Sequence, residues 1–366
     1  MSLLPISSGC TTWPDRPQVT AASQTAAKIP GFQNVRYWAD APISDWNDWR
    51  DQWLADRNSS HITTAPAMLA ISSGSDKGAF GSGYLAGWTA RGDRPEFAVV
   101  TGVSTGALIA PFAFLGSEYD PTLREIYTSI SAKDIFNQRF ISGLAGGPAL
   151  ADTKPLQELI ARHVTTDMLD RIATQHKRGR RLLIATTNLD AGRGVIWDLG
   201  AVATSKSPER LHLARKILLA SASIPVMFPP VMVDVIDGNT NFSEMHVDGG
   251  TTGSVFGLPS AIVWGDDESF VAPKDVSITV LYNGQIAPDY KVVSPKTYSI
   301  AGRALDTLID QADRELIRSY RNFARDKGIA FELVAIDPTY KMSDAGLFNQ
   351  QAMQRLFDQG LRQAKH

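Results

Sequence analysis

The most constraining feature of this sequence is a Gly-Val-Ser-Thr-Gly pentapeptide in which Ser104 stands between Gly102 and Gly106. It follows an apolar, β-branched run at 97–101 and precedes a run of good helix formers at 107–110. We therefore expect a buried strand, a sharp turn and a helix, with Ser104 at the turn. The glycines are needed because a β-carbon in so tight a turn would collide with neighbouring backbone. Such a turn, a nucleophile elbow, lifts the serine hydroxyl above the sheet, next to the positive end of the helix.

Strand-like and helix-like segments alternate from residue 67 onward. A strand at 68–72 leads through a glycine-rich loop into a helix at 81–91, ahead of the elbow. Further strands are expected at 181–187, 194–199, 231–235, 245–247, 276–282 and 330–336, and helices at 300–326 and from 349. This pattern predicts an α/β fold with a mainly parallel central sheet between two layers of helices.

The 366 residues, 43% of them hydrophobic, are enough for one large domain with an N-terminal extension. We expect a polar tether at 1–35, an aromatic-rich extension at 36–66 and the main domain at 67–366. Three tryptophans of the extension are spaced to share one face of a helix with Ser44 as its N-cap: Trp46, Trp49 and Trp53. Aspartates occupy the opposite face, so this helix is expected to pack on the domain rather than on a membrane.

Composition excludes several classes of function. The formal net charge of −2 and the lack of an extended basic patch argue against a nucleic-acid partner. No run approaches the roughly 20 apolar residues of a membrane-spanning helix. The single cysteine excludes an internal disulfide and a multi-cysteine metal site, and we expect no metal and no cofactor.

That cysteine, Cys10, ends a Leu-Leu-Pro-Ile-Ser-Ser-Gly run resembling the end of a bacterial lipoprotein signal. The match is imperfect because no positive residues precede it and the apolar run is short. One interpretation is a lipidated Cys10 that attaches the protein to a membrane of the bacterial envelope. The other is a disordered N-terminus on a cytoplasmic protein, and the sequence leaves both open.

A glycine- and serine-rich loop at 72–83 follows the first strand and opens a helix. Its free amides and the helix dipole can hold a developing oxyanion. A nucleotide-binding loop is the alternative, but the Gly-Lys-Ser/Thr of a P-loop is missing and the fit to a dinucleotide fingerprint is loose. We therefore expect no nucleotide.

The base that would serve Ser104 is harder to identify. Of six histidines only His246 lies near a plausible site, and a lone histidine in a strand is more often structural. Asp248 is the better choice, because it ends a strand and is followed by Gly249 and Gly250, which permit close backbone approach. Burial would raise the pKa of this carboxylate and make it a stronger base. A simple Asp-Gly turn is the structural alternative.

Four motifs in this order resemble the patatin-like phospholipases: the loop, the elbow, a small-residue block with a Phe-Pro-Pro turn at 218–230 and the Asp-Gly-Gly at 248–250. The resemblance covers about residues 67–255. It implies an acyl-lipid or phospholipid substrate and a Ser–Asp dyad without histidine, with Ser104 as nucleophile and Asp248 as base. It also assigns the oxyanion amides to the loop, at Ser73, Gly74 and Ser75, with Lys77 and Gly78 completing it.

The sequence departs from the family where Ser73 and Ser75 replace two loop glycines. Serine keeps the amide but lacks the freedom of glycine to adopt positive φ. We expect the loop to use conformations open to serine; otherwise the protein would be a catalytically weakened lipid-binding protein. A Ser-His-Asp esterase using His246 is a further alternative, and the glycine-rich segment at 143–148 is a candidate flap over an acyl groove.

Overall fold

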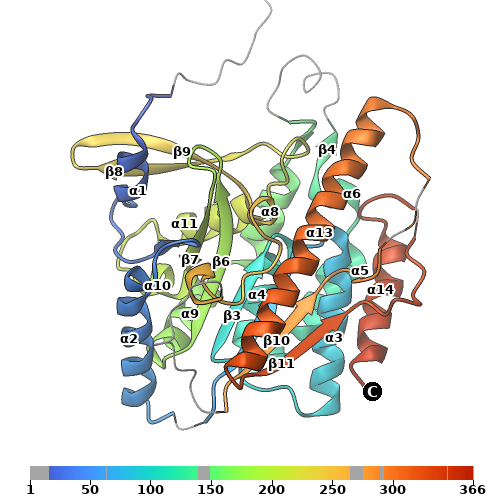
Figure 1. Cartoon of the computed structure of the whole chain (residues 1–366), viewed down its shortest axis with the longest axis horizontal. Helices are drawn as coiled ribbons and strands as arrows, with labels where there is room; N and C mark the ends of the chain where they lie inside the picture. The colour runs from blue at the N-terminus through green and yellow to red at the C-terminus, as the bar shows by residue number, and fades with distance from the viewer. Residues whose placement is uncertain are drawn as a thin grey trace, which may run out of the picture.

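The computed structural model describes residues 16–62, 64–138, 149–263, 275–288, 290, 292–343 and 345–365. Cys10 and the candidate flap at 143–148 lie outside the described residues. Figure 1 shows a central sheet flanked by helices, with the long helix α13 crossing in front of it.

Five parallel strands form the centre of the main sheet. In spatial order they are β11 (Ala330–Ala335), β10 (Ser277–Tyr282), β2 (Ala67–Ile71), β3 (Val99–Val103) and β6 (Arg181–Asn188). Every residue of β3 and β6 is buried, as expected of parallel strands with helices on both faces. The predicted mainly parallel sheet is confirmed, although β3 begins two residues later than the expected run at 97–101.

Antiparallel strands extend this sheet beyond β6. They are β7 (Arg193–Asp198), β1 (Arg36–Trp38), β9 (Thr240–Asp248) and β8 (Val231–Asp237). Both β7 and β9 pair with β6, while β1 pairs with β7 and β8 with β9. A separate small sheet joins β4 (Asn137–Gln138) to β5 (Ala151–Asp152). The β8–β9 hairpin is important for the site because it ends at Asp248.

Helices cover both faces and complete three layers. One face is covered by α3 (Gly78–Arg91), α4 (Thr105–Leu115), α5 (Asp120–Ser129), α8 (Lys154–His163), α9 (Thr166–Lys177), α10 (Leu199–Thr204), α11 (Arg210–Ser221) and α14 (Gln350–Gln363). The other is covered by α2 (Ile43–Ser59), α12 (Ser260–Val263) and α13 (Thr297–Asp326). Alternate side chains of β6 enter different cores: Leu182 and Ile184 the first, Leu183 and Ala185 the second. The predicted three-layer α/β/α architecture is confirmed.

The start of helix α2 differs from expectation. Pro42 holds the N-cap position, and Ser44 lies inside the first turn with its hydroxyl bonded to Asp45 at 3.1 Å. The assignment of Ser44 as N-cap is therefore wrong, because the φ of Pro42 already sets the chain for entry into the helix two residues earlier. The buried faces of Trp46 and Trp53 pack against the sheet, and Trp53 Nε1 donates to the carbonyl of Gly179 at 2.9 Å.

The N-terminal segment lies along the surface of the same domain. It contains the short helix α1 (Ala21–Ala26) and buries Ile29 and Phe32. Lys28 forms an isolated antiparallel bridge with Ile236 of β8. The remaining short elements are α6 (Ala132–Ile135) and three 3₁₀ turns, η1 (Ser75–Lys77), η2 (Ser117–Tyr119) and η3 (Gly249–Thr251).

Candidate active site

The ends of β3 and β9 meet along one edge of β6. Val103, the last residue of β3, pairs with Ala185, and Asp248, the last residue of β9, pairs with Thr186. These two residues of β6 are consecutive, and a strand rises only about 3.3 Å per residue. Since Ser104 directly follows Val103, strand register brings Ser104 next to Asp248.

Ser104 occupies a strained turn, with φ 56° and ψ −121°. Non-glycine residues rarely adopt such angles, which cost on the order of 1–3 kcal/mol. A β-carbon at Gly102 would lie 2.4 Å from the carbonyl oxygen of Gly106, and one at Gly106 would lie 2.3 Å from that of Ile71. Both glycines are thus required where the first turn of α4 crosses the ends of β2 and β3.

Asp248 is a buried carboxylate with one oxygen left for a partner. Gly250 donates its amide to Oδ1 at 2.7 Å, while Oδ2 makes no well-formed hydrogen bond to a described residue. The nearby Ser104 hydroxyl is close enough to favour the charged form. Burial nevertheless raises the pKa of Asp248 to about 7, against the opposing effects of Ser104 and Gly250. A carboxylate with this pKa can accept a proton near neutral pH.

Gly249 lets the end of β9 approach β6 closely. A β-carbon at Gly249 would lie 2.5 Å from the carbonyl oxygen of Ala185. The two glycines after Asp248 therefore have different roles. Gly249 permits the close backbone contact with β6, and Gly250 supplies the amide that binds the Asp248 carboxylate.

Helix α11 supplies an anchor that the sequence did not single out. The Ser221 hydroxyl accepts the amide of Ser104 at 3.0 Å and donates to the carbonyl of Ala185 at 2.7 Å. Two residues later, the carbonyl of Ser223 accepts the amide of Asp248 at 2.9 Å. Both serines lie in the small-residue block at 218–230, so the family resemblance was the only signal that could have found them. The start of this block thus holds Ser104 and Asp248 at once.

The loop after β2 presents two free amides. Neither the amide of Gly74 nor that of Ser75 donates a hydrogen bond to a described residue. The amide of Ser73 donates to the carbonyl of Ser254 at 2.8 Å. The inclusion of Ser73 among the oxyanion donors is therefore wrong, because its amide is committed to holding the loop in place.

Ser75 has a φ of 55°, in the left-handed region. We expected the loop to use conformations open to serine, and at Ser75 this expectation is wrong. The left-handed conformation of this residue costs about 1 kcal/mol. Contacts beyond the loop impose the conformation: the Ser73 amide is held by Ser254, and the amide of Phe348 donates to Asp76 Oδ2 at 3.0 Å.

Asn283 clamps this loop and was missed by the sequence analysis. Its amide donates to Ser72 Oγ at 2.7 Å, its Nδ2 donates to the carbonyl of Ser72 at 3.0 Å, and its Oδ1 accepts the amide of Gly81 at 3.1 Å. A β-carbon at Gly74, where φ is 153°, would lie 2.6 Å from Asn283. The available signal was position, since Asn283 follows a predicted strand at the sheet edge where parallel α/β folds bind ligands.

The remaining loop residues have separate roles. A β-carbon at Gly78 would lie 2.3 Å from Thr105 Oγ1, so this glycine lets the start of α3 pack on the start of α4. Two helix N-termini, each favourable to negative charge, thereby converge near Ser104. Lys77 is exposed, and its charge opposes the rise that burial causes in the pKa of Asp76.

A sequence profile of the family described as patatin-like phospholipase matches residues 69–261, more than half of the chain. This chain belongs to the patatin-like phospholipase family. The match runs from β2 into α12 and includes the loop, the elbow and Asp248. Family membership supports lipid acyl hydrolysis as the general class of activity.

Among solved structures, this patatin-like chain is similar to VipD from Legionella pneumophila, with a TM-score of 0.42 and 12% identity. The similarity covers 82% of this chain and 66% of VipD, so the chain spans slightly less than two thirds of that protein. No curated protein matches the sequence.

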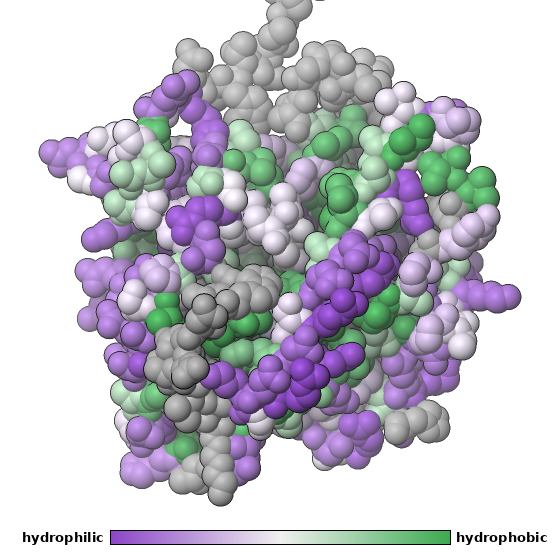
Figure 2. All heavy atoms as spheres, in the orientation of Figure 1, coloured by the Kyte–Doolittle hydropathy of each residue, from purple (hydrophilic) through white to green (hydrophobic). Residues whose placement is uncertain are grey.

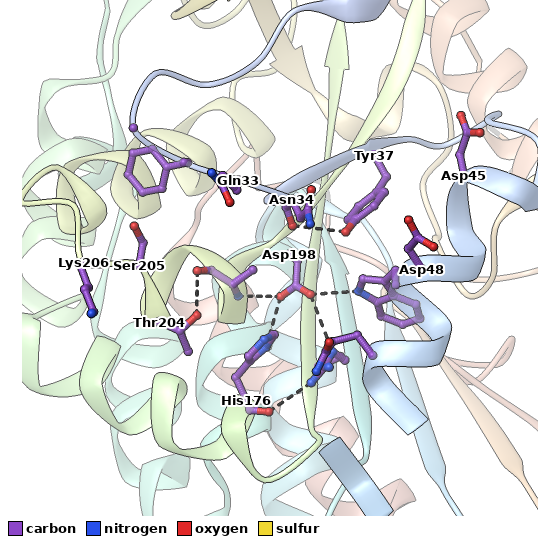
Figure 3. Close-up of a pocket in the computed structure, with 16 residues that line it drawn as sticks. Gln33, Asn34, Tyr37, Asp45, Asp48, His176, Asp198, Thr204, Ser205 and Lys206 are labelled. Atoms are coloured by element: carbon purple, nitrogen blue, oxygen red, sulfur yellow. Dashed lines mark hydrogen bonds and ion pairs between the residues drawn. The ribbon is translucent and has the colours of Figure 1, made fainter. Parts of the chain in front are cut away.

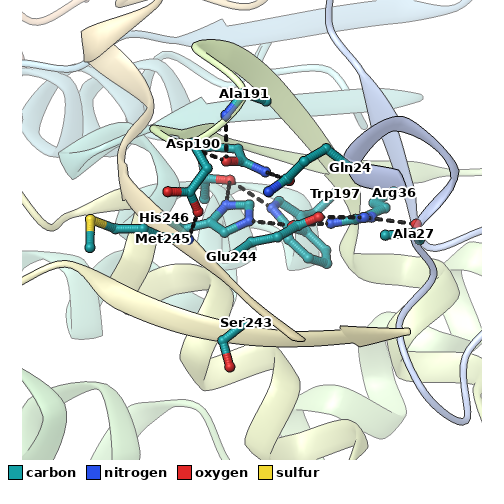
Figure 4. Close-up of polar contacts among 12 residues, drawn as sticks. Gln24, Ala27, Arg36, Asp190, Ala191, Trp197, Ser243, Glu244, Met245 and His246 are labelled. Carbon is teal, nitrogen blue, oxygen red and sulfur yellow. Dashed lines mark hydrogen bonds and ion pairs between the residues drawn. The ribbon is translucent and has the colours of Figure 1, made fainter. Parts of the chain in front are cut away.

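His246 of this patatin-like domain belongs to a buried polar network (Figure 4). Its Nδ1 lies 2.9 Å from Thr186 Oγ1 and its Nε2 lies 3.0 Å from Glu244 Oε2. Arg36 of β1 pairs with the same glutamate, and Trp197 Nε1 donates to Thr186 at 2.8 Å. Burial lowers the pKa of His246, against the opposing effect of Glu244. Both ring nitrogens of His246 thus have partners, and the network as a whole joins β1, β6, β7 and β9.

A cavity of about 940 Å³ lies between the N-terminal extension and helices α9 and α10 (Figure 3). Its lining includes Arg181 at the start of β6 and Asp198 at the end of antiparallel β7. The cavity therefore lies at the opposite end of the strands from Ser104. Asp198 accepts Trp49 Nε1 at 3.0 Å and the amide of Ala201 at 2.9 Å. This carboxylate therefore serves the packing of α2 and α10 in the patatin-like domain.

Within the described ranges, no three His, Cys, Asp or Glu side chains are grouped as metal ligands. None of the helices described there is long and apolar enough to span a bilayer.

Proposed function

We propose that this protein hydrolyses carboxylic esters of lipids, as a phospholipase A or related acyl hydrolase, with Ser104 as nucleophile and Asp248 as base. One observation carries the proposal: a serine in a strained elbow lies beside a buried carboxylate whose pKa is about 7. The carboxylate is charged enough at neutral pH to take the serine proton, and basic enough to hold it.

Acylation follows from this arrangement. Asp248 takes the hydroxyl proton of Ser104 as Oγ forms a bond to the ester carbonyl carbon, and the carbonyl electron pair moves onto oxygen. The tetrahedral intermediate then collapses and breaks the bond to the alcohol, which leaves with the proton from Asp248. The product bound to the protein is an ester of Ser104.

Deacylation repeats these steps with water. Asp248 takes a proton from water as its oxygen adds to the acyl carbon. Collapse of the second tetrahedral intermediate releases the carboxylic acid, and Ser104 recovers its proton from Asp248. One carboxylate is sufficient because it alternates between base and acid.

The free amides of Gly74 and Ser75, beside the N-terminus of α4, are the proposed oxyanion donors. Each such donor contributes about 3 kcal/mol to the transition state in other hydrolases. A lipid-binding protein with weakened catalysis is the second candidate, and the left-handed φ of Ser75 is the observation that favours it. Nothing favours the His246 esterase, since both ring nitrogens of His246 have partners.

A fluorophosphonate probe with intact-mass analysis tests the proposal. We expect stoichiometric labelling that Ser104→Ala abolishes and that Ser117→Ala, a serine in η2, leaves intact. Ser104→Ala and Asp248→Asn should each lower p-nitrophenyl ester turnover by at least about 10³-fold, while His246→Gln keeps most of it. Absence of labelling in the folded protein would favour the lipid-binding candidate. Activity retained in Asp248→Asn but lost in His246→Gln would identify a histidine-based esterase.

A further inference from the structure

Helix α13 projects beyond the end of the sheet at which Ser104 lies, and we call this end the catalytic edge. It connects the parallel neighbours β10 and β11 and therefore runs antiparallel to them. Asp313 in its middle lies at the end of β10, since Tyr282 Oη donates to its Oδ2 at 3.0 Å. Residues 297–312 precede that level and, at 1.5 Å per residue, extend about 24 Å past it. Figure 1 shows this half of α13 continuing past the ends of β10 and β11.

The apolar side of the projecting half has no cover among the described residues. In the other half, Ile317 and Tyr320 are 3% and 5% exposed in the core beneath the helix. In the projecting half, Leu305 and Leu308 are 52% and 69% exposed. Figure 2 shows hydrophobic surface around the upper end of α13 and hydrophilic surface along its lower part.

Exposed hydrophobic side chains concentrate at this edge. Of the ten large ones in the described part of the chain, Leu54 of α2 stands apart. The other nine follow the C-terminal ends of β6, β10, β11 or α11, and we call them the docking rim: Leu189, Val226, Tyr290, Val292, Ile300, Leu305, Leu308, Met342 and Leu347. Val226 follows Ser223, which holds the amide of Asp248, by three residues. The rim therefore surrounds the end of the sheet that carries Ser104.

The N-terminal segment enters the structure at the same edge. Arg16, the first described residue, donates to Asp190 Oδ1 at 3.0 Å and to the carbonyl of Ser243 at 2.9 Å. Asp190 lies two residues past the end of β6, on the side of the sheet that carries Ser104. Cys10 precedes Arg16 by only six residues, which span at most about 20 Å. A lipid on Cys10 would thus hold this edge, rather than the opposite one, against a membrane.

We propose that the docking rim seats the catalytic edge on a lipid surface. The proposal rests on the proposed function, because a lipid substrate is what makes a lipid surface the partner. Single side chains that rise from several separate segments suit shallow insertion, about 5–10 Å into the boundary between head groups and acyl chains. The acyl ester bonds of a phospholipid lie at that boundary, on the side of the sheet that carries Ser104.

Vesicle binding tests the rim without interference from hydrolysis. In a Ser104→Ala background, the Leu305→Ser/Leu308→Ser double variant should partition onto phosphatidylcholine–phosphatidylglycerol vesicles about ten-fold less strongly, by sedimentation. Leu54→Ser, an exposed leucine of α2, is the matched control and should change partitioning by less than about two-fold. The midpoint of thermal unfolding should fall only slightly, and similarly per substitution in both variants, since all three leucines are exposed residues of helix interiors.

The catalytic forms separate this proposal from the proposed function. With Ser104 present, the double variant should hydrolyse monomeric p-nitrophenyl butyrate at the parental rate and vesicle phospholipid more slowly. Undiminished vesicle binding by the double variant would overturn the docking rim and leave the esterase standing. Rim-dependent vesicle binding without any ester turnover would support the rim and overturn the proposed function. A dimer that dissociates in the double variant, by sedimentation velocity, would assign the rim to a second copy of this chain and overturn lipid docking.

Discussion

The amide of Ser104 donates a hydrogen bond to the hydroxyl of Ser221 at 3.0 Å, across a separation of 117 residues. The same hydroxyl donates to the carbonyl of Ala185, which lies next to the β6 residue that pairs with Asp248. One small side chain thus sets the elbow against the strand that aligns the candidate base.

Ser221→Ala should loosen this alignment. The substitution leaves a buried amide and a buried carbonyl without their partner, which costs about 1–3 kcal/mol of stability. We expect kcat for a p-nitrophenyl ester to fall about ten-fold with little change in KM, because the loss concerns the position of the nucleophile. Urea unfolding and steady-state kinetics measure both. Ser223→Ala is the control, because among the described residues Ser223 Oγ bonds only the Leu219 carbonyl, which also accepts the amide of Ala222. Equal losses in the two variants would contradict a special role for Ser221.

The pH profile should report the titration of Asp248. Only the ionised carboxylate can accept the Ser104 proton, and its pKa is about 7. We expect kcat/KM for a neutral ester to rise ten-fold per pH unit below about 7 and to level off above it. Asp313, whose pKa burial raises to about 6, is the competing group. The midpoint should stay in place in Asp313→Asn, and its loss there would assign the profile to Asp313.

Asp248→Asn should stabilise the fold in a pH-dependent manner. The pKa of Asp248 is raised from 3.8 to about 7, so the folded state binds more protons than the unfolded state between these values. Its carboxylate therefore destabilises the fold increasingly as pH rises through this window, by on the order of 4 kcal/mol above pH 7. The variant should unfold at higher urea concentration than the parent at pH 8, with the difference shrinking towards pH 4. A difference independent of pH would show that ionisation of Asp248 is not its cause.

Ser75→Gly should relieve the left-handed φ of 55° without removing the amide. We expect a gain of about 0.5–1 kcal/mol in unfolding free energy and an unchanged or higher kcat. Gly74→Ser tests the opposite case, because a β-carbon there would lie 2.6 Å from Asn283. That variant should be strongly destabilised. A large fall in kcat for Ser75→Gly would reveal a role for the serine hydroxyl itself.

Arg36→Met should show what the buried network contributes to stability. It would leave Glu244, fully buried beside His246, without its cationic partner. Breaking such a pair costs about 3–5 kcal/mol. Arg318→Met removes an exposed pair with Glu315 and should cost less than about 0.5 kcal/mol. Chemical unfolding of both variants measures the contrast, and similar small losses would show that the network contributes little.

Local chemistry was sufficient to predict the elbow and the main strands from sequence. The elbow at Ser104 follows from two glycines between a strand and a helix, and the main strands follow from short apolar runs. The family resemblance linked Ser104 to Asp248 before any contact between them was known. Errors arose where local preference met other constraints: Pro42 displaced Ser44 at a helix start, and distant anchors forced Ser75 into a left-handed conformation.

The tertiary structure alone decided how these parts meet. Val103 and Asp248 are separated by 145 positions in the chain, yet they pair with consecutive residues of β6, and nothing local to either strand sets that register. The same holds for the bonds of Ser221 to Ser104 and of Asn283 to Ser72, each across more than 100 residues. The burial that raises the pKa of Asp248 to about 7 is likewise a property of the assembled fold. A sequence pattern determines residue type and local turn, whereas desolvation and hydrogen-bond partners arise only when distant segments pack together.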